Sequence, residues 1–142
     1  MIDWRQRVVK EALEWVGTPY RHYTVKKGLG CDCGLFILQV YENVDLIKFD
    51  MPEFYPADWA MHNPIGEMFE DIVKKYCKSV DNKELDIGDL ILYHFGKNLS
   101  HASILLEKNM IIHSETNIGV RVSNREHNHW YKRERKYYTL CQ

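Results

Sequence analysis

Three residues of this sequence could together carry nucleophilic chemistry: one cysteine at a predicted helix start and two histidines in predicted strands. Cys33 follows a glycine-containing turn and begins an apolar segment, whereas His101 and His113 lie in stretches of strand-like character. The N–H groups and dipole at a helix N-terminus favour a thiolate, and an imidazole can accept the thiol proton. The pattern predicts Cys33 as a nucleophile, with His101 as its base.

Cys31 is the competing thiol, because only Asp32 separates it from Cys33. Two residues so close cannot share one helix-end position, and they cannot form an unstrained disulfide with each other. Cys33 is followed at once by the apolar segment, so we expect Cys31 to lie in the preceding turn. Cys77 is predicted on the apolar face of a helix, as a small packing residue.

His113 is the candidate for a third group that orients His101. Both side chains lie on one face of a hairpin only if paired residue numbers sum to an even value. A two-residue turn at Lys108 and Asn109 would place the histidines on opposite faces. We therefore predict a three-residue loop over 107–109, or an equivalent bulge, with Asn109 in the left-handed conformation that such loops need.

Helical periodicity precedes strand-like segments along the chain. Helices are predicted over 3–16, with Asp3 as the cap, over 33–44, and from an Asn63–Pro64 start to about residue 77, after a long connection over 45–62. Strands are predicted over 89–95, 101–107, 110–114, 118–122 and 136–140. This order indicates an α+β fold with an antiparallel sheet, in one domain spanning residues 1–142.

Composition excludes several classes of function. The 142 residues carry a formal net charge of -1, so no general basic field attracts nucleic acid. No stretch approaches the ~20 apolar residues of a membrane span. Charged residues between Asp3 and Glu14 interrupt any signal-peptide core. We expect synthesis in the cytoplasm without a signal peptide, and no cofactor.

Other interpretations of the same residues stay open. Cys31, Cys33, His101 and His113 are all legitimate zinc ligands, although common structural zinc sites separate their cysteines by two residues. A catalytically idle peptide-binding module, or acyl transfer to an acceptor other than water, would use the same fold. Tyr20 follows Pro19 near the cysteine loop, where its hydroxyl would either line a substrate cleft or be buried at the turn.

At these residues the chain resembles the NlpC-like cysteine peptidases of bacterial cell-wall remodelling, most of all their phage-tail branch. The matching segments are Trp15-Val16-Gly17-Thr18-Pro19-Tyr20, Gly30-Cys31-Asp32-Cys33-Gly34-Leu35, Gly88-Asp89-Leu90, Ser100-His101-Ala102-Ser103-Ile104 and Ile112-His113, with Tyr55-Pro56-Ala57-Asp58-Trp59 similar to phage members. Most relatives have a serine between the cysteine and the glycine, which is absent here.

The resemblance implies a papain-like α+β fold, with the nucleophile helix packed on a five- to six-stranded antiparallel sheet. It implies hydrolysis of peptidoglycan stem peptides, usually between D-γ-glutamyl and a diamino acid. Cys33 matches the nucleophile, His101 the base and His113 the third polar residue, while Tyr20 and Asp32 match positions that border the substrate. The implied partners are the stem peptide and phage tail proteins, and the implied location is the cell wall, as part of a virion tail.

Overall fold

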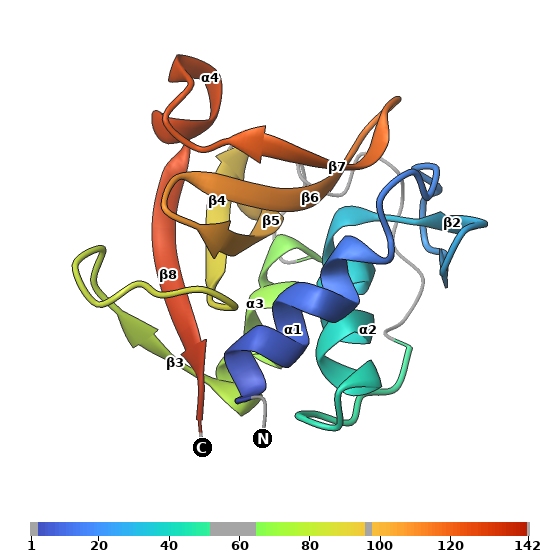
Figure 1. Ribbon diagram of the computed structural model, residues 1–142, viewed down its shortest axis with the longest axis horizontal. Coiled ribbons are helices and arrows are strands. Elements are labelled where there is room, and N and C mark those ends of the chain that lie inside the picture. Colours follow the sequence, from blue (N-terminus) through green and yellow to red (C-terminus); the bar gives the residue numbers. More distant parts are fainter. Residues whose placement is uncertain (1–2, 52–64, 96–97, 142) are drawn as a thin grey trace.

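The computed structural model describes residues 3–51, 65–95 and 98–141, in which helices cover one face of a six-stranded antiparallel sheet (Figure 1). The sheet has the strand order β3-β8-β4-β5-β6-β7. The elements are α1 (Trp4–Leu13), β1 (Val25–Lys26), β2 (Gly30–Cys31), α2 (Cys33–Asn43), α3 (Ile65–Tyr76), β3 (Cys77–Val80), β4 (Leu90–Phe95), β5 (Asn98–Glu107), β6 (Met110–Glu115), β7 (Gly119–Asn124), α4 (Asn128–Tyr131) and β8 (Glu134–Leu140). The predicted α+β class is confirmed.

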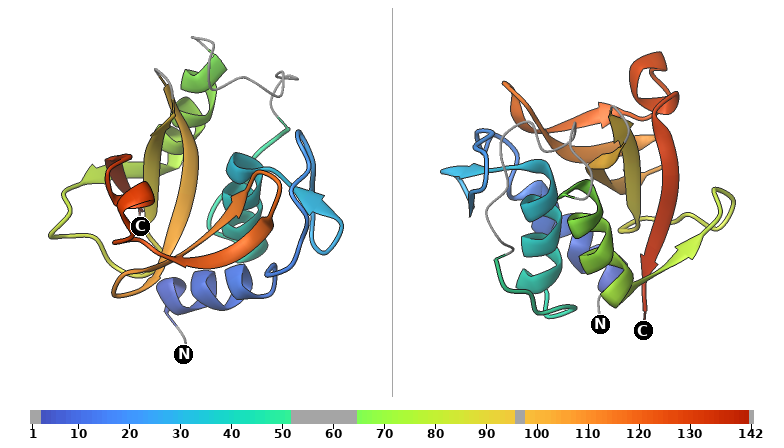
Figure 2. Two further views of the ribbon diagram at one scale, coloured as in Figure 1. Left: turned by 90° about the horizontal axis from the view of Figure 1, so that it is seen from above. Right: turned by 180° about the vertical axis from the view of Figure 1, so that it is seen from behind.

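The main core lies between the sheet and the helices α1, α2 and α3 (Figure 2). Helix α2 is apolar around most of its circumference and packs on β5 and β6. On β5, Ala102, Ile104 and Leu106 alternate toward this core, as the sequence pattern predicts. Burial on most sides explains why α2 lacks the polar stripe of a surface helix.

A second, smaller core covers the other face of the sheet. It contains Ile91, Tyr93, Leu105 and Ile111 from β4, β5 and β6, together with Trp130 from the short helix α4. His101 alternates with Ala102 along β5, so it lies on this second face. The surroundings of His101 therefore include this second core, to which α4 contributes Trp130.

The C-terminal ends of two helices differ from the predicted ones. Helix α1 begins after Asp3, as predicted, and Asp3 Oδ1 accepts the Arg5 N–H at 2.7 Å. The helix ends at Leu13 rather than at residue 16. A tighter turn follows, in which the Gly17 N–H donates to the Val120 carbonyl at 3.0 Å. Cys77 does not extend α3. It begins β3, where it pairs with Leu140 on β8.

The strands β1, β2 and β3 were not predicted from the sequence, because the first two contain only two residues each. The predicted Asn63–Pro64 helix start and the Tyr55–Trp59 motif lie outside the described residues. Among the helices that are described, none combines the length and apolar character needed to cross a bilayer.

Candidate active site

Cys33 is the first residue of α2, as predicted, and its side chain is 5% exposed. Asp32 caps the helix: its backbone is extended, and its Oδ1 accepts the Leu35 N–H at 2.9 Å. The thiol therefore lies among the N–H groups of the first helical turn, where an oxyanion could also be bound.

The loop before Cys33 is fixed by bonds to three other segments. The Cys31 N–H donates to the Pro19 carbonyl at 3.0 Å, and the Ser114 hydroxyl donates to the Cys31 carbonyl at 2.9 Å. The second carboxylate oxygen of Asp32 accepts the Tyr23 N–H at 3.0 Å. The Ser114 bond ties the start of α2 to β6, the strand that carries His113.

The two predicted histidines are brought together. His101 Nε2 lies 2.8 Å from His113 Nδ1, and both side chains are buried. The hairpin uses the predicted bulge: Glu107 pairs with Met110, but Leu105 pairs with Ile111, so the extra residue restores an even register.

The prediction that Asn109 adopts the left-handed conformation in this hairpin is wrong. Lys108, with a φ of 46°, adopts it, whereas Asn109 is not among the residues with positive φ. The bulge follows a two-residue turn, which moves the left-handed position one residue toward the N-terminus.

The N-terminal end of α2, which begins with Cys33, packs on β5, the strand that carries His101. Strands β5 and β6 pair from Glu107↔Met110 to Ile104↔Ile112, although β5 begins at residue 98 and β6 ends at residue 115. The backbone N–H of Ala102, next to His101, is one of the groups that lower the pKa of the Cys33 thiol. The start of α2 therefore lies against the end of β5 that carries the histidine.

Burial raises the pKa of the Cys33 thiol, and the Asp32 carboxylate raises it further. Backbone N–H groups of Gly34, Ala102 and Cys33 itself lower this pKa, but they do not outweigh burial. Burial also raises the pKa of Cys31, to about 12. The N–H groups at the helix start therefore favour the thiolate, as predicted, but burial has the larger effect on the pKa of Cys33.

Two further polar groups, which sequence reasoning missed, hold the far side of His113. Its Nε2 lies 2.9 Å from Ser123 Oγ and 3.2 Å from Glu115 Oε1. Glu115 was open to prediction, because residues two apart on a strand share a face. Ser123 belongs to β7, and its position depends on the β6–β7 register, which pairs Ile111 with Ser123.

Trp130 covers the histidine pair on the second face of the sheet. Its ring stacks on His101 with centroids 4.8 Å apart at 24°, and it meets His113 edge-on at 4.7 Å and 81°. Tyr93 packs against the same indole at 5.3 Å. The sequence carries no signal for this contact, because Trp130 is distant along the chain and lies in a four-residue helix.

The model of the NlpC/P60 family matches residues 17–139, a range that includes Cys33, both histidines and Tyr20. The chain belongs to the NlpC/P60 family. A curated relative, the murein DD-endopeptidase MepS/murein LD-carboxypeptidase of Escherichia coli K12, is 26% identical over 133 residues. This match covers 93% of the chain and 61% of the relative, so the chain spans less than two thirds of that protein.

Solved structures of NlpC/P60 proteins share the fold. A lipoprotein-like family member from Staphylococcus aureus has a TM-score of 0.73 at 21% identity, covering 100% of this chain and 43% of that one. The NlpC/p60 domain of the peptidoglycan hydrolase SagA has 0.67 at 18%, covering 98% and 100%. RipD of Mycobacterium tuberculosis, described as a non-catalytic NlpC/p60 domain protein, has 0.65 at 18%, covering 100% of both.

Tyr20 of this NlpC/P60 chain lies beside the cysteine loop, where it forms a parallel bridge with Cys31. Burial raises the pKa of its hydroxyl, and negative charge on Cys33 or Asp32 raises this pKa further. A hydrogen bond with Thr116 lowers it. The residue as a whole is half-buried. This position suits the predicted role at the edge of a substrate site.

Gly34, which follows Cys33 directly, lies close to helix α3. A Cβ at this position would lie 3.1 Å from the Phe69 ring of α3. A side chain here would therefore press against α3. Asp32, the other predicted substrate-bordering residue, is buried and has both carboxylate oxygens bonded to backbone N–H groups.

The zinc interpretation finds no support within residues 3–51, 65–95 and 98–141. In those ranges, no three histidine, cysteine, aspartate or glutamate side chains are placed to hold a metal ion together. His101 and His113 turn two of their nitrogens toward each other rather than toward a common point.

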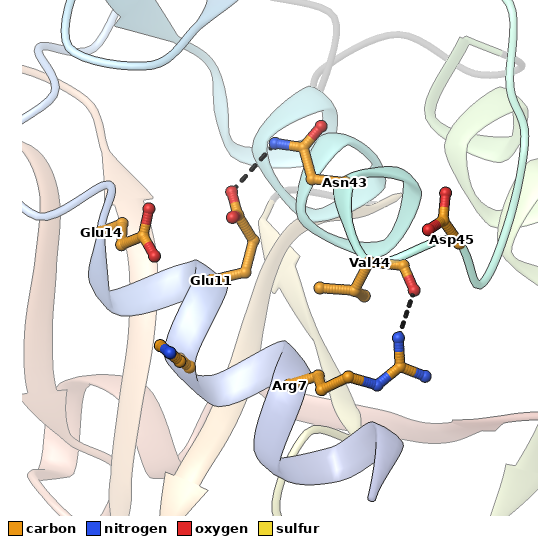
Figure 3. A pocket seen from close by; sticks show the side chains of 7 residues that line it. Arg7, Glu11, Glu14, Asn43, Val44 and Asp45 are labelled. Atoms are coloured by element: carbon orange, nitrogen blue, oxygen red, sulfur yellow. Dashed lines mark hydrogen bonds between the residues drawn. The ribbon is translucent and has the colours of Figure 1, made fainter. Parts of the chain in front are cut away.

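A separate groove of about 650 Å³ lies between α1 and the C-terminal end of α2 (Figure 3). Its lining mixes both charges, and several side chains already have partners: Glu11 accepts from the Asn43 amide at 2.9 Å, and Arg7 donates to the Val44 carbonyl at 2.9 Å. Because α2 is eleven residues long, this groove lies roughly 15 Å from Cys33 along the helix axis. It does not form part of the cysteine site.

Proposed function

We propose that this chain is a cysteine peptidase that hydrolyses peptidoglycan stem peptides. The observation that carries the proposal is the 2.8 Å hydrogen bond between His101 and His113 beside a cysteine at a helix N-terminus. The relationship to the murein endopeptidase MepS supports the choice of substrate.

In the proposed mechanism, Nδ1 of His101 accepts the Cys33 proton, because its Nε2 is engaged by His113. The sulfur attacks the amide carbonyl, and the carbonyl electrons move to oxygen. N–H groups at the start of α2 hold this oxyanion. The C–N bond then breaks as the His101 imidazolium protonates the leaving amine, and a thioester remains on Cys33.

Water completes the cycle by attacking the thioester carbonyl while His101 removes its proton. The C–S bond breaks, the free acid leaves, and Cys33 recovers its proton from His101. The raised pKa of Cys33 makes the base important for attack by the sulfur, and in the second half it favours return of the proton from His101 as the C–S bond breaks. Because the same Nδ1 of His101 protonates the amine and then removes a proton from water, the water molecule must take the place that the leaving amine vacates.

The proposal extends to the bond and the setting, on the strength of the sequence motifs. The bond is the one between D-γ-glutamyl and the diamino acid of the stem peptide. The place of action is the cell wall, and the motifs similar to phage members favour a tail-associated protein with other tail proteins as partners.

Mass analysis of muropeptides after incubation with purified peptidoglycan tests this function. Wild type should release new fragments whose masses identify the bond. Cys33→Ala should release none, and Cys31→Ala, a matched loss of a neighbouring buried thiol, should retain activity. Cleavage by Cys33→Ala would contradict the proposal. Absence of cleavage by the wild type would instead place the chain with non-catalytic family members such as RipD.

A further inference from the structure

Glu115 lies at the end of the hydrogen-bonded histidine pair, two residues beyond His113 on β6. Its Oε1 is 3.2 Å from His113 Nε2, on the opposite side of the ring from His101. Arg121 of β7 donates to the same oxygen from Nε at 3.0 Å and lies 2.9 Å from it through Nη2. An arginine at this distance is the partner of an ionised carboxylate, which can only accept hydrogen bonds.

We propose that Glu115 fixes the tautomers of both histidines and is a positioning residue for His101. Because the carboxylate only accepts, its negative charge 3.2 Å from Nε2 of His113 favours a proton on that nitrogen, whose hydrogen bond runs to Ser123 Oγ. A neutral His113 then has a bare Nδ1, which accepts a hydrogen bond from His101 Nε2. His101 is thereby left with its lone pair on Nδ1, the nitrogen that takes the Cys33 proton in the proposed mechanism.

Ser123 cannot make this selection alone, although its hydroxyl lies 2.9 Å from the same His113 nitrogen. A hydroxyl donates or accepts equally well, so it satisfies either tautomer of His113. The carboxylate distinguishes the two tautomers, because a bare nitrogen facing it would place two lone pairs in contact.

The proton balance of the cycle is unchanged by Glu115. When Nδ1 of His101 gains the Cys33 proton, its Nε2–H continues to donate to His113, and no proton moves to the carboxylate. The negative charge of Glu115 stabilises the positive charge that forms on His101, with the His113 ring between the two groups. This catalytic consequence rests on the proposed function, whereas the tautomer assignment does not.

Nitrogen-15 NMR of protein labelled at histidine tests the assignment directly, because protonated and bare ring nitrogens give distinct resonances. The chain has seven histidines, so His101→Gln and His113→Gln variants identify the two signals. Spectra are recorded without substrate for wild type, Glu115→Gln and Glu126→Gln. Glu126 is an exposed glutamate, and its replacement is the matched control for the loss of one charge.

Wild type and Glu126→Gln should both show bare Nδ1 and protonated Nε2 on each of the two rings. In Glu115→Gln, an amide that can donate or accept replaces the carboxylate, so each ring should show a mixture. The kcat for peptide cleavage should fall roughly 10- to 100-fold with little change in KM. An unchanged tautomer pattern in Glu115→Gln, or a bare Nε2 on His113 in wild type, would overturn the inference.

The two proposals fail in different ways. If the tautomers respond as described but the wild type cleaves no stem peptide, the positioning role of Glu115 stands and the peptidase function falls. If peptide is cleaved but the tautomers ignore Glu115, the function stands and this inference falls.

Discussion

At Cys33, burial and helix position act on the same sulfur in opposite directions. A helix N-terminus stabilises a negative charge by about 0.3–2 kcal/mol. Full burial can shift a pKa by 3–5 units, or roughly 4–7 kcal/mol. Burial therefore prevails, in agreement with the raised pKa of this thiol.

The buried thiols also make stability depend on pH in the alkaline range. Burial raises the pKa of Cys77 from 9.0 to about 12, with smaller contributions from the charges of Cys141 and Asp89. Above pH 9 the unfolded chain loses this proton while the folded chain keeps it, so the folded state loses stability as pH rises toward 12. The slope from one such thiol is up to about 1.4 kcal/mol per pH unit.

Urea unfolding at pH 8.5 to 10 under reducing conditions measures this effect. Cys77→Ala should show a shallower loss of unfolding free energy with pH than wild type, since the tyrosines contribute equally to both proteins. Cys141→Ala removes an exposed cysteine and should keep the wild-type slope. Parallel slopes for Cys77→Ala and wild type would refute the assignment.

Residue types and register arithmetic were enough to predict that Cys33 begins α2 and that a bulged hairpin brings His101 and His113 together. The glycine turn before an apolar helix selects Cys33 over Cys31, and parity selects a bulged hairpin for His101 and His113. Trp130 and Ser123 escaped prediction because their contacts depend on how β7, α4 and β8 fold back over the second face of the sheet, which no local pattern specifies.

At the scale of elements, β7 supports the segment that carries Tyr20. Val120 N–H donates to the Thr18 carbonyl at 2.9 Å, and Gly119 has a φ of 100°. A Cβ on Gly119 would lie 2.4 Å from the Thr18 oxygen. Glycine is needed here both for its conformation and because two backbones approach closely.

Gly119→Ala should therefore destabilise the protein by roughly 2–4 kcal/mol, the sum of backbone strain and displacement of a neighbouring backbone. Gly28→Ala is the matched control: it also has positive φ, at 83°, but its Cβ would meet nothing within 4 Å. Its cost should be about 1 kcal/mol. Equal losses for the two variants, measured by chemical unfolding, would show that the close approach to Thr18 carries no energetic weight.

At the scale of the whole molecule, Asp89 joins helix α1 to β4 and β8. Its side chain is fully buried. Its Oδ1 accepts from Arg5 Nη1 at 2.7 Å and from Thr139 Oγ1 at 2.6 Å, and its Oδ2 accepts the Asp86 N–H at 2.9 Å. The Gly88-Asp89-Leu90 segment, noted in the sequence only as a family motif, thus ties the N-terminal helix to two strands of the sheet.

Removing the buried carboxylate in Asp89→Ala should cost about 3–5 kcal/mol, because Arg5 and Thr139 lose their common partner. Asp86→Ala removes the other carboxylate near Arg5, at 3.7 Å, whose side chain is 61% exposed. That loss should stay below about 1 kcal/mol. Comparable unfolding free energies for the two variants would contradict the role given to Asp89.

The overall architecture was open to prediction because amphipathic helices precede alternating strands, and that order restricts the fold class. The order of the strands within the sheet could not be predicted from the sequence. The pairing of β3 with β8 joins residues about sixty positions apart, and this pairing begins at Cys77. Long-range pairing of this kind leaves no mark on local sequence.

The central claim is that His101, and not the helix end, activates Cys33. The rate of iodoacetamide modification at each cysteine, mapped by mass spectrometry near pH 7, tests it most directly. Cys33 should react faster than the other buried thiols, Cys31 and Cys77, in wild type, and its rate should fall by roughly 100-fold or more in His101→Ala. Equal Cys33 rates in the two proteins would contradict the claim.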